Sequence, residues 1–179
     1  MDNGESSLRR YMDGNREAFG EIVETYYRGI VIFVMRYVCD ESEAENIASD
    51  TLFELMIKPE KYNLRSSLKT YLYAIARNKA IGFLRKAHRA LLISDIPEED
   101  SGEPSPEELA IDRDEKLRLR AAVDSLPRDM REAVGLVICA GMSYRDAATV
   151  MGVGTKKIDN LVNRAKKRLK AELSGGNKE

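Results

Sequence analysis

The segment 143–173 constrains the fold of this chain more than any other stretch. It reads SYRDAATVMGVGTKKIDNLVNRAKKRLKAEL. Ser143 is a good helix N-cap with Asp146 three residues later, and Gly152 to Gly154 provide a tight turn before a second helix. Small or apolar residues recur at helical spacing on both sides of that turn: Ala147, Ala148, Met151, Ile158, Leu161, Val162, Ala165 and Leu169. This pattern predicts a helix-turn-helix.

The outward face of the second predicted helix carries cations, amides and one carboxylate. These residues are Lys156, Lys157, Asp159, Asn160, Asn163, Arg164, Lys166 and Lys167. Amides and cations on one helix suit a groove of double-stranded DNA, whose base edges and phosphates they can bind. The alternative is an ordinary surface helix with a lysine-rich solvated face, which would not need the glycine turn before it.

Charge is unevenly distributed along the chain. The 179 residues carry a formal net charge of only -1, with 33% charged residues. Residues 94–115, SDIPEEDSGEPSPEELAIDRDE, are strongly acidic and contain three prolines. We expect a flexible linker there, since this stretch offers little to bury. The near-neutral total therefore does not exclude a nucleic-acid partner.

The rest of the chain also predicts helices, because no segment shows the two-residue alternation typical of strands. Apolar spacing predicts helices over 15–38, 67–92 and 128–141, and a capping box from Ser42 to Glu45 predicts another starting near Glu43. We expect an all-α protein with two small helical domains, 1–93 and 116–179, joined by the acidic linker 94–115. The second domain ends in the helix-turn-helix.

The predicted helix 67–92 mixes aromatic and basic side chains. Its polar and aromatic residues include Tyr71, Arg77, Asn78, Lys79, Arg85 and Lys86. Such mixing suits a single-stranded nucleic acid, because each base stacked on an aromatic ring contributes ~1–3 kcal/mol while cations neutralise phosphates. A solvated basic face with tyrosines half in the core is an equally good interpretation.

Several classes of site are not expected. His88 is the single histidine, and no nucleophile, base and orienting group occur together, so we expect no catalytic residues, metal or cofactor. The apolar run Ile30 to Met35 is far shorter than the ~20 residues of a membrane span, and the first residues lack an apolar signal region. Cys39 and Cys139 are expected to be buried thiols in a reducing cytosol. We therefore expect a cytoplasmic protein without membrane insertion.

Four segments, taken in order, resemble bacterial sigma factors of the extracytoplasmic-function (group IV) type. AFGEIVETYYRGIVIFVMRYV, SEAENIASDTLFELM and RSSLKTYLYAIARNKAIGFLRK are similar to sigma domain two. SLPRDMREAVGLVICAGMSYRDAATVMGVGTKKIDNLVNRAKKRL is similar to sigma domain four. The resemblance implies a factor that binds RNA polymerase core and promoter DNA, needs no small-molecule substrate, and is held inactive by an anti-sigma factor.

The resemblance also implies two sets of contacts in the first domain. Polymerase core would bind Glu45, Asn46, Ser49, Asp50 and Phe53, with Ser49 where the family often has glutamine. Tyr62, Asn63 and Arg65 would capture a flipped base of the minus-ten element. Further along, Tyr71 stands where the family commonly has tryptophan, and the cationic and amide contacts to melted DNA would be Arg77, Asn78, Lys79, Arg85 and Lys86.

In the second domain the resemblance implies reading of the minus-thirty-five element. Ile158-Asp159-Asn160-Leu161-Val162 stands where the commoner family pattern is valine-lysine-serine-arginine-leucine, and it resembles a subset with aspartate-asparagine. Asp159 would accept from a cytosine amine or brace a lysine, and Asn160 would pair with adenine. The implied contacts are Ser143, Tyr144, Arg145, Lys156, Lys157, Asp159, Asn160, Asn163, Arg164, Lys166 and Lys167.

Two other functions stay open on sequence grounds. One is a helix-turn-helix transcriptional regulator that binds duplex DNA without core polymerase. It would need a ligand-binding or dimerisation domain, which the segment YLYAIARNKAIGFLRK does not obviously supply. The other is a sigma-like domain used only for protein interaction.

Overall fold

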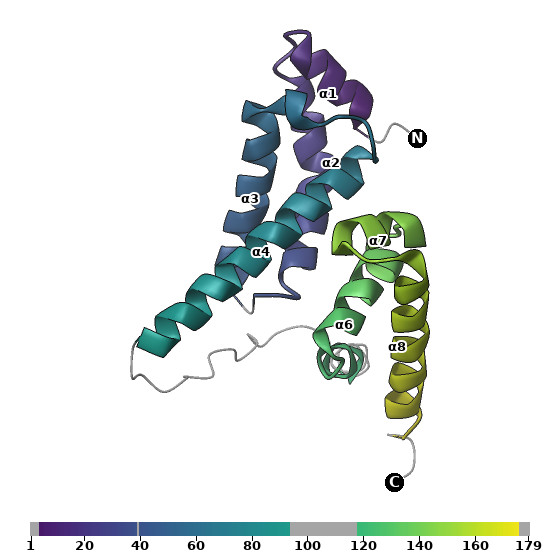
Figure 1. Cartoon of the computed structure of the whole chain (residues 1–179). Coiled ribbons are helices and arrows are strands. Elements are labelled where there is room, and N and C mark those ends of the chain that lie inside the picture. The colour runs from purple at the N-terminus through teal and green to yellow at the C-terminus, as the bar shows by residue number, and fades with distance from the viewer. Residues whose placement is uncertain (1–3, 39, 94–117, 176–179) are drawn as a thin grey trace, which may run out of the picture. The chain divides into compact units, whose positions relative to one another are not determined.

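The computed structural model describes residues 4–38, 40–93 and 118–175, and Figure 1 draws the others as a thin grey trace. The regular elements in these ranges are all helical, which confirms the predicted all-α fold. The chain divides into two compact units, one containing α1 to α4 and the other containing α6 and α8. The predicted linker 94–115 lies outside the described residues.

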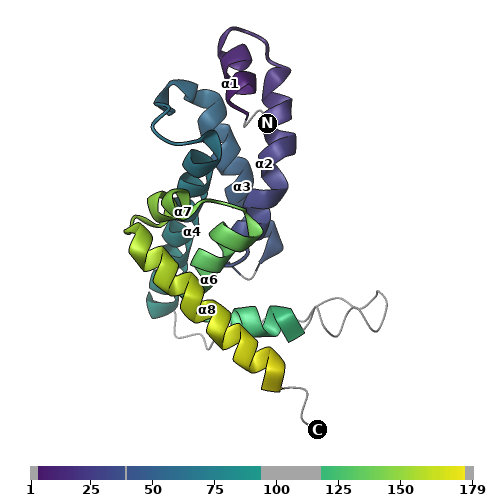
Figure 2. The same ribbon diagram turned by 90° about the vertical axis from the view of Figure 1, so that its right-hand side faces the viewer.

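The first unit is a helical bundle. Its elements are α1 (Glu5–Met12), α2 (Ala18–Val34), α3 (Glu41–Ile57), the 3-10 turn η1 (Pro59–Lys61) and α4 (Leu68–Ile93). α2 packs against α1 and α3, and α4 packs against both α2 and α3 (Figures 1 and 2). The core between them is made of fully buried aliphatic side chains, among them Ile22, Ile30, Val34, Leu55, Leu68 and Leu72. Each such side chain contributes roughly 1.5–3 kcal/mol of burial free energy.

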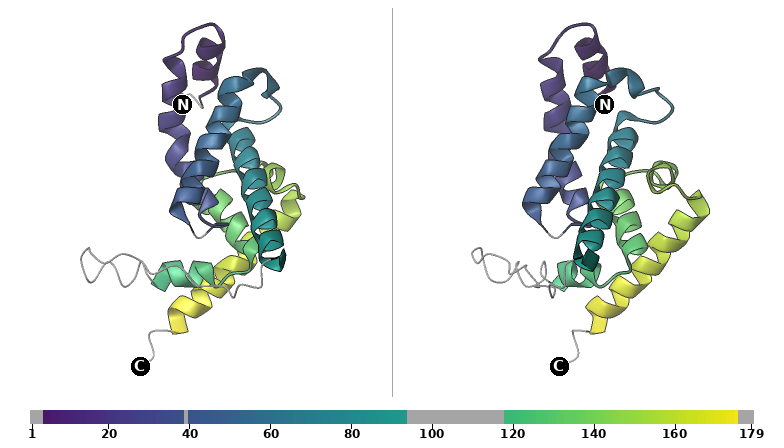
Figure 3. Two further views of the ribbon diagram at one scale, coloured as in Figure 1. Left: turned by 90° about the vertical axis from the view of Figure 1, so that its left-hand side faces the viewer. Right: turned by 60° about the vertical axis from the view of Figure 1, so that its left-hand side comes forward.

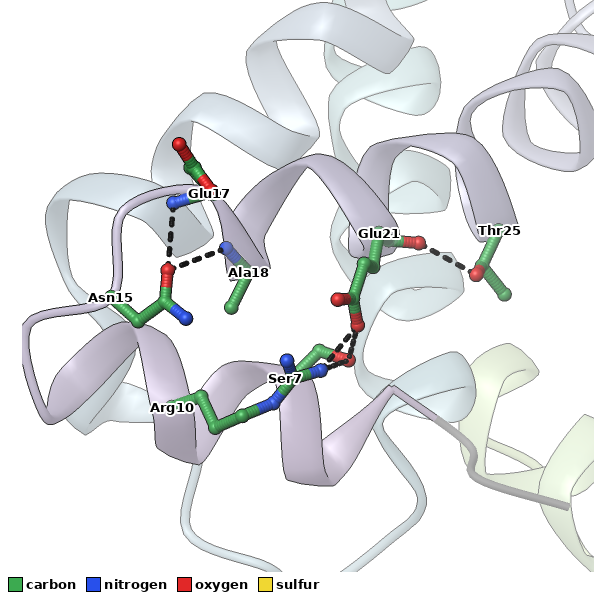
Figure 4. A network of polar contacts seen from close by, with 7 residues as sticks. All are labelled: Ser7, Arg10, Asn15, Glu17, Ala18, Glu21 and Thr25. Carbon is green, nitrogen blue, oxygen red and sulfur yellow. Dashed lines mark hydrogen bonds and ion pairs between the residues drawn. The ribbon is translucent and has the colours of Figure 1, made fainter.

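Helix α1 is an element that the apolar pattern did not predict. A polar network attaches it to α2 (Figure 4): the Ser7 hydroxyl donates to Glu21 Oε2 at 2.7 Å, and Arg10 pairs with the same carboxylate. In the turn between the two helices, Asn15 Oδ1 accepts from the backbone amide of Glu17 at 3.1 Å. The sequence ESSLRRYM is too short and too polar to form a stable helix alone, so tertiary contacts stabilise this helix.

The start of α3 differs from the predicted capping box. The N-cap is Asp40, whose side chain accepts from the Glu43 amide at 3.2 Å, and the helix begins at Glu41. Asp40 has the extended backbone that an N-cap requires, with φ -110 and ψ 120, so it displaces Ser42 from that role. At α4 the expected start is confirmed, because Ser67 Oγ accepts from the Thr70 amide at 3.2 Å.

The second unit contains the predicted helix-turn-helix. After a helical stretch at 118–124 come α6 (Arg128–Val134), the π-helical turn η2 (Gly135–Cys139), α7 (Tyr144–Met151) and α8 (Thr155–Gly175). α6 packs along α8. Ser143 Oγ accepts from the Asp146 amide at 3.1 Å at the start of α7, and Gly152 takes the left-handed φ of +66 between α7 and the long yellow α8 of Figure 3.

The segment 128–141 is not one continuous α-helix. Its second half is the π-turn η2, in which the amide of Ala140 donates to the carbonyl of Gly135 at 2.9 Å. The extra residue in this turn shifts the side chains that follow it. Ile138 is 51% exposed, and Cys139 is exposed, contrary to the expected buried thiol. Cys39 lies outside the described residues.

Candidate functional site

Helix α3 segregates its side chains into a buried and an exposed face. Its buried side chains include Ala44, Ile47, Ala48, Leu52 and Leu55. The predicted core-polymerase contacts are all exposed, namely Glu45, Asn46, Ser49, Asp50 and Phe53. Phe53 and Ile57 are each 55% exposed and lie one helical turn apart, so an apolar pair adjoins the acidic and amide side chains. This face of α3 therefore exposes a mixed polar and apolar surface.

The loop after α3 holds one predicted contact inside the domain. Tyr62 is only 8% exposed. Its hydroxyl lies 2.7 Å from two acceptors, Glu5 Oε1 and the carbonyl oxygen of Ser66, and its ring lies 5.4 Å from that of Tyr71. Burial, reinforced by the Glu5 carboxylate, raises the pKa of Tyr62, so the phenol stays protonated. In this conformation little of its ring is exposed.

The exposed tip of the same loop is Asn63, Leu64 and Arg65. Asn63 Oδ1 accepts from the Arg65 amide at 3.2 Å, which closes an Asx turn. Leu64 is 60% exposed and has a left-handed φ of 58. Sequence reasoning missed Leu64, because a leucine gives no signal for the left-handed conformation that glycine and asparagine usually adopt.

Helix α4 divides its predicted DNA contacts between three environments. Asn78, Arg85 and Lys86 are exposed, while Arg77 is partly buried. The ammonium of Lys79 is paired with Glu54 Oε2 of α3 at 3.1 Å. The cation of Lys79 therefore joins two helices, and the Glu54 carboxylate offsets its positive charge.

Two tyrosines of α4 lie in different surroundings. Tyr71 is partly exposed, and burial followed by the Glu54 and Glu60 carboxylates raises its pKa, so its hydroxyl stays neutral. Tyr73 is 3% exposed, and its ring lies 5.1 Å from that of Phe33 in the core. Of the two, only Tyr71 offers ring surface to a base.

Helix α8 separates buried from exposed residues as the apolar pattern predicts. Ile158, Leu161, Val162 and Ala165 are buried, whereas Leu169, which the same pattern predicted to be buried, is partly exposed. The exposed residues among its predicted contacts are Lys156, Lys157, Asn160, Asn163, Arg164, Lys166 and Lys167. Asp159 is partly exposed, and its Oδ1 accepts from Asn163 Nδ2 at 3.0 Å. This bond orients two polar side chains along one face of α8.

The N-terminus of α7 is already occupied by a carboxylate. Ser143 and Arg145 are exposed and Tyr144 is partly exposed. The Ser143 hydroxyl donates to Asp146 Oδ2 at 2.6 Å. An acidic side chain in the first turn satisfies the positive end of the helix, so a phosphate binding there would meet a competing negative charge.

The described ranges contain no group of three histidine, cysteine or acidic side chains arranged to hold a metal ion. In the same ranges, no helix combines the length and apolar character that crossing a membrane would require.

Two family models match the chain. The one described as Sigma-70 region 2 matches residues 22–90, and the one described as Sigma-70, region 4 matches residues 116–169. Over 130 residues the chain is 33% identical to the ECF RNA polymerase sigma factor EcfG of Rhodopseudomonas palustris (strain TIE-1), covering 73% of this chain and 71% of that protein. The chain belongs to the extracytoplasmic-function sigma factors. As an alternative sigma factor, it directs promoter recognition and transcription initiation by RNA polymerase.

Further relatives of this sigma factor extend the likeness to nearly its whole length. The RNA polymerase sigma-H factor of Pseudomonas aeruginosa is 27% identical over 176 residues, covering 93% of this chain and 91% of that protein. The sigma factor RpoE of Bartonella quintana, solved in complex with the anti-sigma factor NepR, superposes with a TM-score of 0.72 and 28% identity. That match covers 88% of this sigma factor and 98% of that chain.

The two matched ranges contain all the predicted contact residues of the sigma factor. The region 2 match, 22–90, spans α3, the loop 58–67 and most of α4, and the region 4 match, 116–169, spans α7 and most of α8. Helix α1 lies before the first match and carries Glu5, the hydrogen-bond partner of Tyr62.

Proposed function

We propose that this sigma factor uses three surfaces on two domains, 1–93 and 116–179, joined by the linker 94–115. The exposed face of α3 binds polymerase core. The loop 58–67 and the exposed side of α4 bind the melted minus-ten element, and α8 reads the minus-thirty-five element in duplex DNA. The observation that carries this proposal is the segregation on α3, where five implied contacts are exposed and the residues between them are buried.

The minus-ten surface suits an extruded base. Asn63 offers an amide that can pair with a base edge, and Leu64 and Arg65 beside it offer an apolar surface and a cation. Arg85 and Lys86, farther along α4, are exposed cations that can follow the phosphates. Melting is then driven by binding free energy, so the factor itself performs no covalent chemistry.

The cellular location of the factor follows from these partners. The factor acts in the cytoplasm, where core polymerase and the chromosome are found. An anti-sigma factor is a further partner, and this part of the proposal is supported by the likeness to Bartonella quintana RpoE, which was solved bound to NepR.

Charge reversal on α3 tests the proposed core surface. Asp50→Lys replaces an attractive charge at the interface with a repulsive one, so core affinity should fall by ~10-fold or more. The measurement is competition for core polymerase against a labelled sigma factor. Glu24→Lys makes the same charge change on an exposed position of α2 and should leave core affinity unchanged.

Binding of the full chain to a minus-thirty-five duplex without core provides the second readout. Asp50→Lys should leave it intact, because Asp50 lies in the first unit and α8 in the second. Equal loss of core and duplex binding would indicate unfolding, and unchanged core affinity would contradict the proposed surface.

A further inference from the structure

Helix α1 contacts the helices or residues at both ends of the loop 58–67, which is called the minus-ten loop below. In its last turn, the Tyr11 hydroxyl donates to the carbonyl of Met56 at 3.0 Å, at the end of α3. In its first turn, Glu5 Oε1 accepts from the Tyr62 hydroxyl at 2.7 Å. Gly4 lies close to Leu68, the first residue of α4, since a Cβ at Gly4 would be 3.3 Å from Leu68 Cδ2. A segment outside the region 2 match therefore spans the loop from its start to its finish.

Helix α1 is itself fixed to the bundle. Ser7 and Leu8 are each 3% exposed, and the Tyr11 ring lies 5.0 Å from that of Phe19 on α2. The ionic and hydrogen-bonded contacts of Arg10 and Ser7 with Glu21 add a polar attachment (Figure 4). The Glu5 carboxylate is thus presented to Tyr62 from a packed helix.

The loop tip requires such support. Leu64 occupies the left-handed region, which costs a side chain with a Cβ ~1–2 kcal/mol. Between Tyr62 and Ser66, two features hold the tip: the Asx turn of Asn63 and the Tyr62 hydroxyl, whose one proton is shared between Glu5 Oε1 and the Ser66 carbonyl oxygen. Unusual backbone of this kind persists only where neighbouring contacts determine it.

We propose that Glu5 is a positioning residue for the minus-ten loop. Its carboxylate holds the Tyr62 hydroxyl, and Tyr62 in turn holds Asn63, Leu64 and Arg65 in the conformation that receives the flipped base. The inference rests on the proposed role of the loop, and it assigns to α1 a part in base selectivity at the minus-ten element. The residue acts through Tyr62 and does not itself touch DNA.

The test measures base preference rather than total activity. Transcripts are sequenced after initiation by core polymerase and each full-length variant on a promoter library with a randomised minus-ten element. Glu5→Ala removes the acceptor and should reduce preference at one minus-ten position by ~10-fold, as expected for loss of one charge-assisted hydrogen bond. Glu5→Gln keeps a side-chain oxygen as acceptor and should restore most of that preference. Glu24→Ala, an exposed glutamate of α2, should match the wild type.

A merely structural role for Glu5 gives different results. The proposal would be overturned if Glu5→Ala lowered transcription from all library sequences by the same factor. It would also be overturned if Glu5→Ala and Glu5→Gln had the same base preference at the minus-ten element. Hydrogen exchange in the isolated full chain supplies a second readout: amides of 58–67 should exchange faster in Glu5→Ala, and unchanged exchange there would also overturn it.

Asn63→Ala separates this proposal from the proposed function of the loop. If Asn63→Ala changes minus-ten preference and Glu5→Ala does not, the positioning role is wrong while the loop assignment stands. If neither variant changes the preference, the loop does not read the minus-ten element, and both proposals fail.

Discussion

On the face of α8 proposed to read the minus-thirty-five element, a hydrogen bond between Asp159 and Asn163 orients single side chains. The 3.0 Å hydrogen bond between them fixes the Asp159 carboxylate on the face that also carries the exposed amide of Asn160. The carboxylate of Asp159 and the amide of Asn160 form hydrogen bonds only in certain directions, so they can distinguish one base from another. A lysine ammonium, by contrast, chiefly neutralises the charge of a phosphate.

Two substitutions on α8 should therefore have different effects. Asn160→Ala should reduce discrimination at one base pair of the minus-thirty-five element by ~1–3 kcal/mol, since a bidentate amide contact is lost. Lys166→Ala should weaken binding to all DNA sequences by the same factor. It should also lower the magnitude of the slope of log affinity against log salt concentration by ~0.9, because one phosphate contact is lost. Fluorescence anisotropy with a set of duplexes at several salt concentrations measures both. A uniform loss for Asn160→Ala would contradict its assignment as a base-reading residue.

The sequence predicted the exposed side chains of α8 better than those around the minus-ten loop. On α8 the buried positions follow one helical period, so the remaining residues must face outward. Around the minus-ten loop, by contrast, the exposure of a side chain depends on its contacts with other elements. Tyr62 contacts Glu5, Tyr73 packs in the core beside Phe33, and Lys79 pairs with Glu54. Contacts between residues so distant in sequence leave no local pattern.

At the scale of elements, close packing of α4 on α2 depends on one glycine. A Cβ at Gly29 of α2 would lie 2.7 Å from the Tyr73 hydroxyl oxygen, which is closer than van der Waals contact allows. Tyr73 is buried and packed against Phe33, so its ring has little room to move. Gly29 therefore sets the separation of the helix that carries the proposed minus-ten contacts from the rest of the bundle.

Gly29→Ala should destabilise the first unit by ~1–3 kcal/mol, the usual cost of overpacking a core. Gly20→Ala on the same helix is the matched control, because a Cβ there meets nothing within 4 Å, and it should be neutral or stabilising by up to ~1 kcal/mol. Hydrogen exchange of amides in α2 and α4 at increasing urea reports the free energy of opening for this unit. Equal values for the two variants would show that Tyr73 adapts at no cost.

Among the elements, the long periodic helices and the short α7 before the glycine turn were predictable, whereas the short α1 was not. α2, α4 and α8 carry several turns of apolar residues at helical spacing, and they occur where that spacing predicts. Helix α1 has only eight residues, and the three apolar residues Leu8, Tyr11 and Met12 are too few to predict it. The start of α3 depends on the backbone conformation of Asp40, and η2 depends on an inserted residue within a turn. Neither of these features changes the apolar pattern from which helices are predicted.

At the scale of the whole molecule, the proposed function divides promoter recognition between two units, each of which binds a different part of one promoter. Each unit carries its own exposed surface, α3 with the loop 58–67 in one and α8 in the other. Under this proposal, covalent connection makes the second DNA contact intramolecular, so the two contacts together bind a promoter more tightly than either does alone. The net charge of -1 hides this arrangement, because acidic residues elsewhere in the chain offset the cations of α8.

Reconstituted transcription tests the central claim most directly. Purified full-length chain is added to core polymerase on a library randomised in both promoter elements, and the transcripts are sequenced. We predict that transcription initiates at defined start sites and that the transcribed templates are enriched in particular base sequences at both the minus-ten and the minus-thirty-five elements. When the Asp50→Lys variant is used at limiting protein concentration, both enrichments should be lost. Binding to duplex DNA without association with core, and with no transcripts above core alone, would contradict the account and indicate a helix-turn-helix regulator that acts without core polymerase.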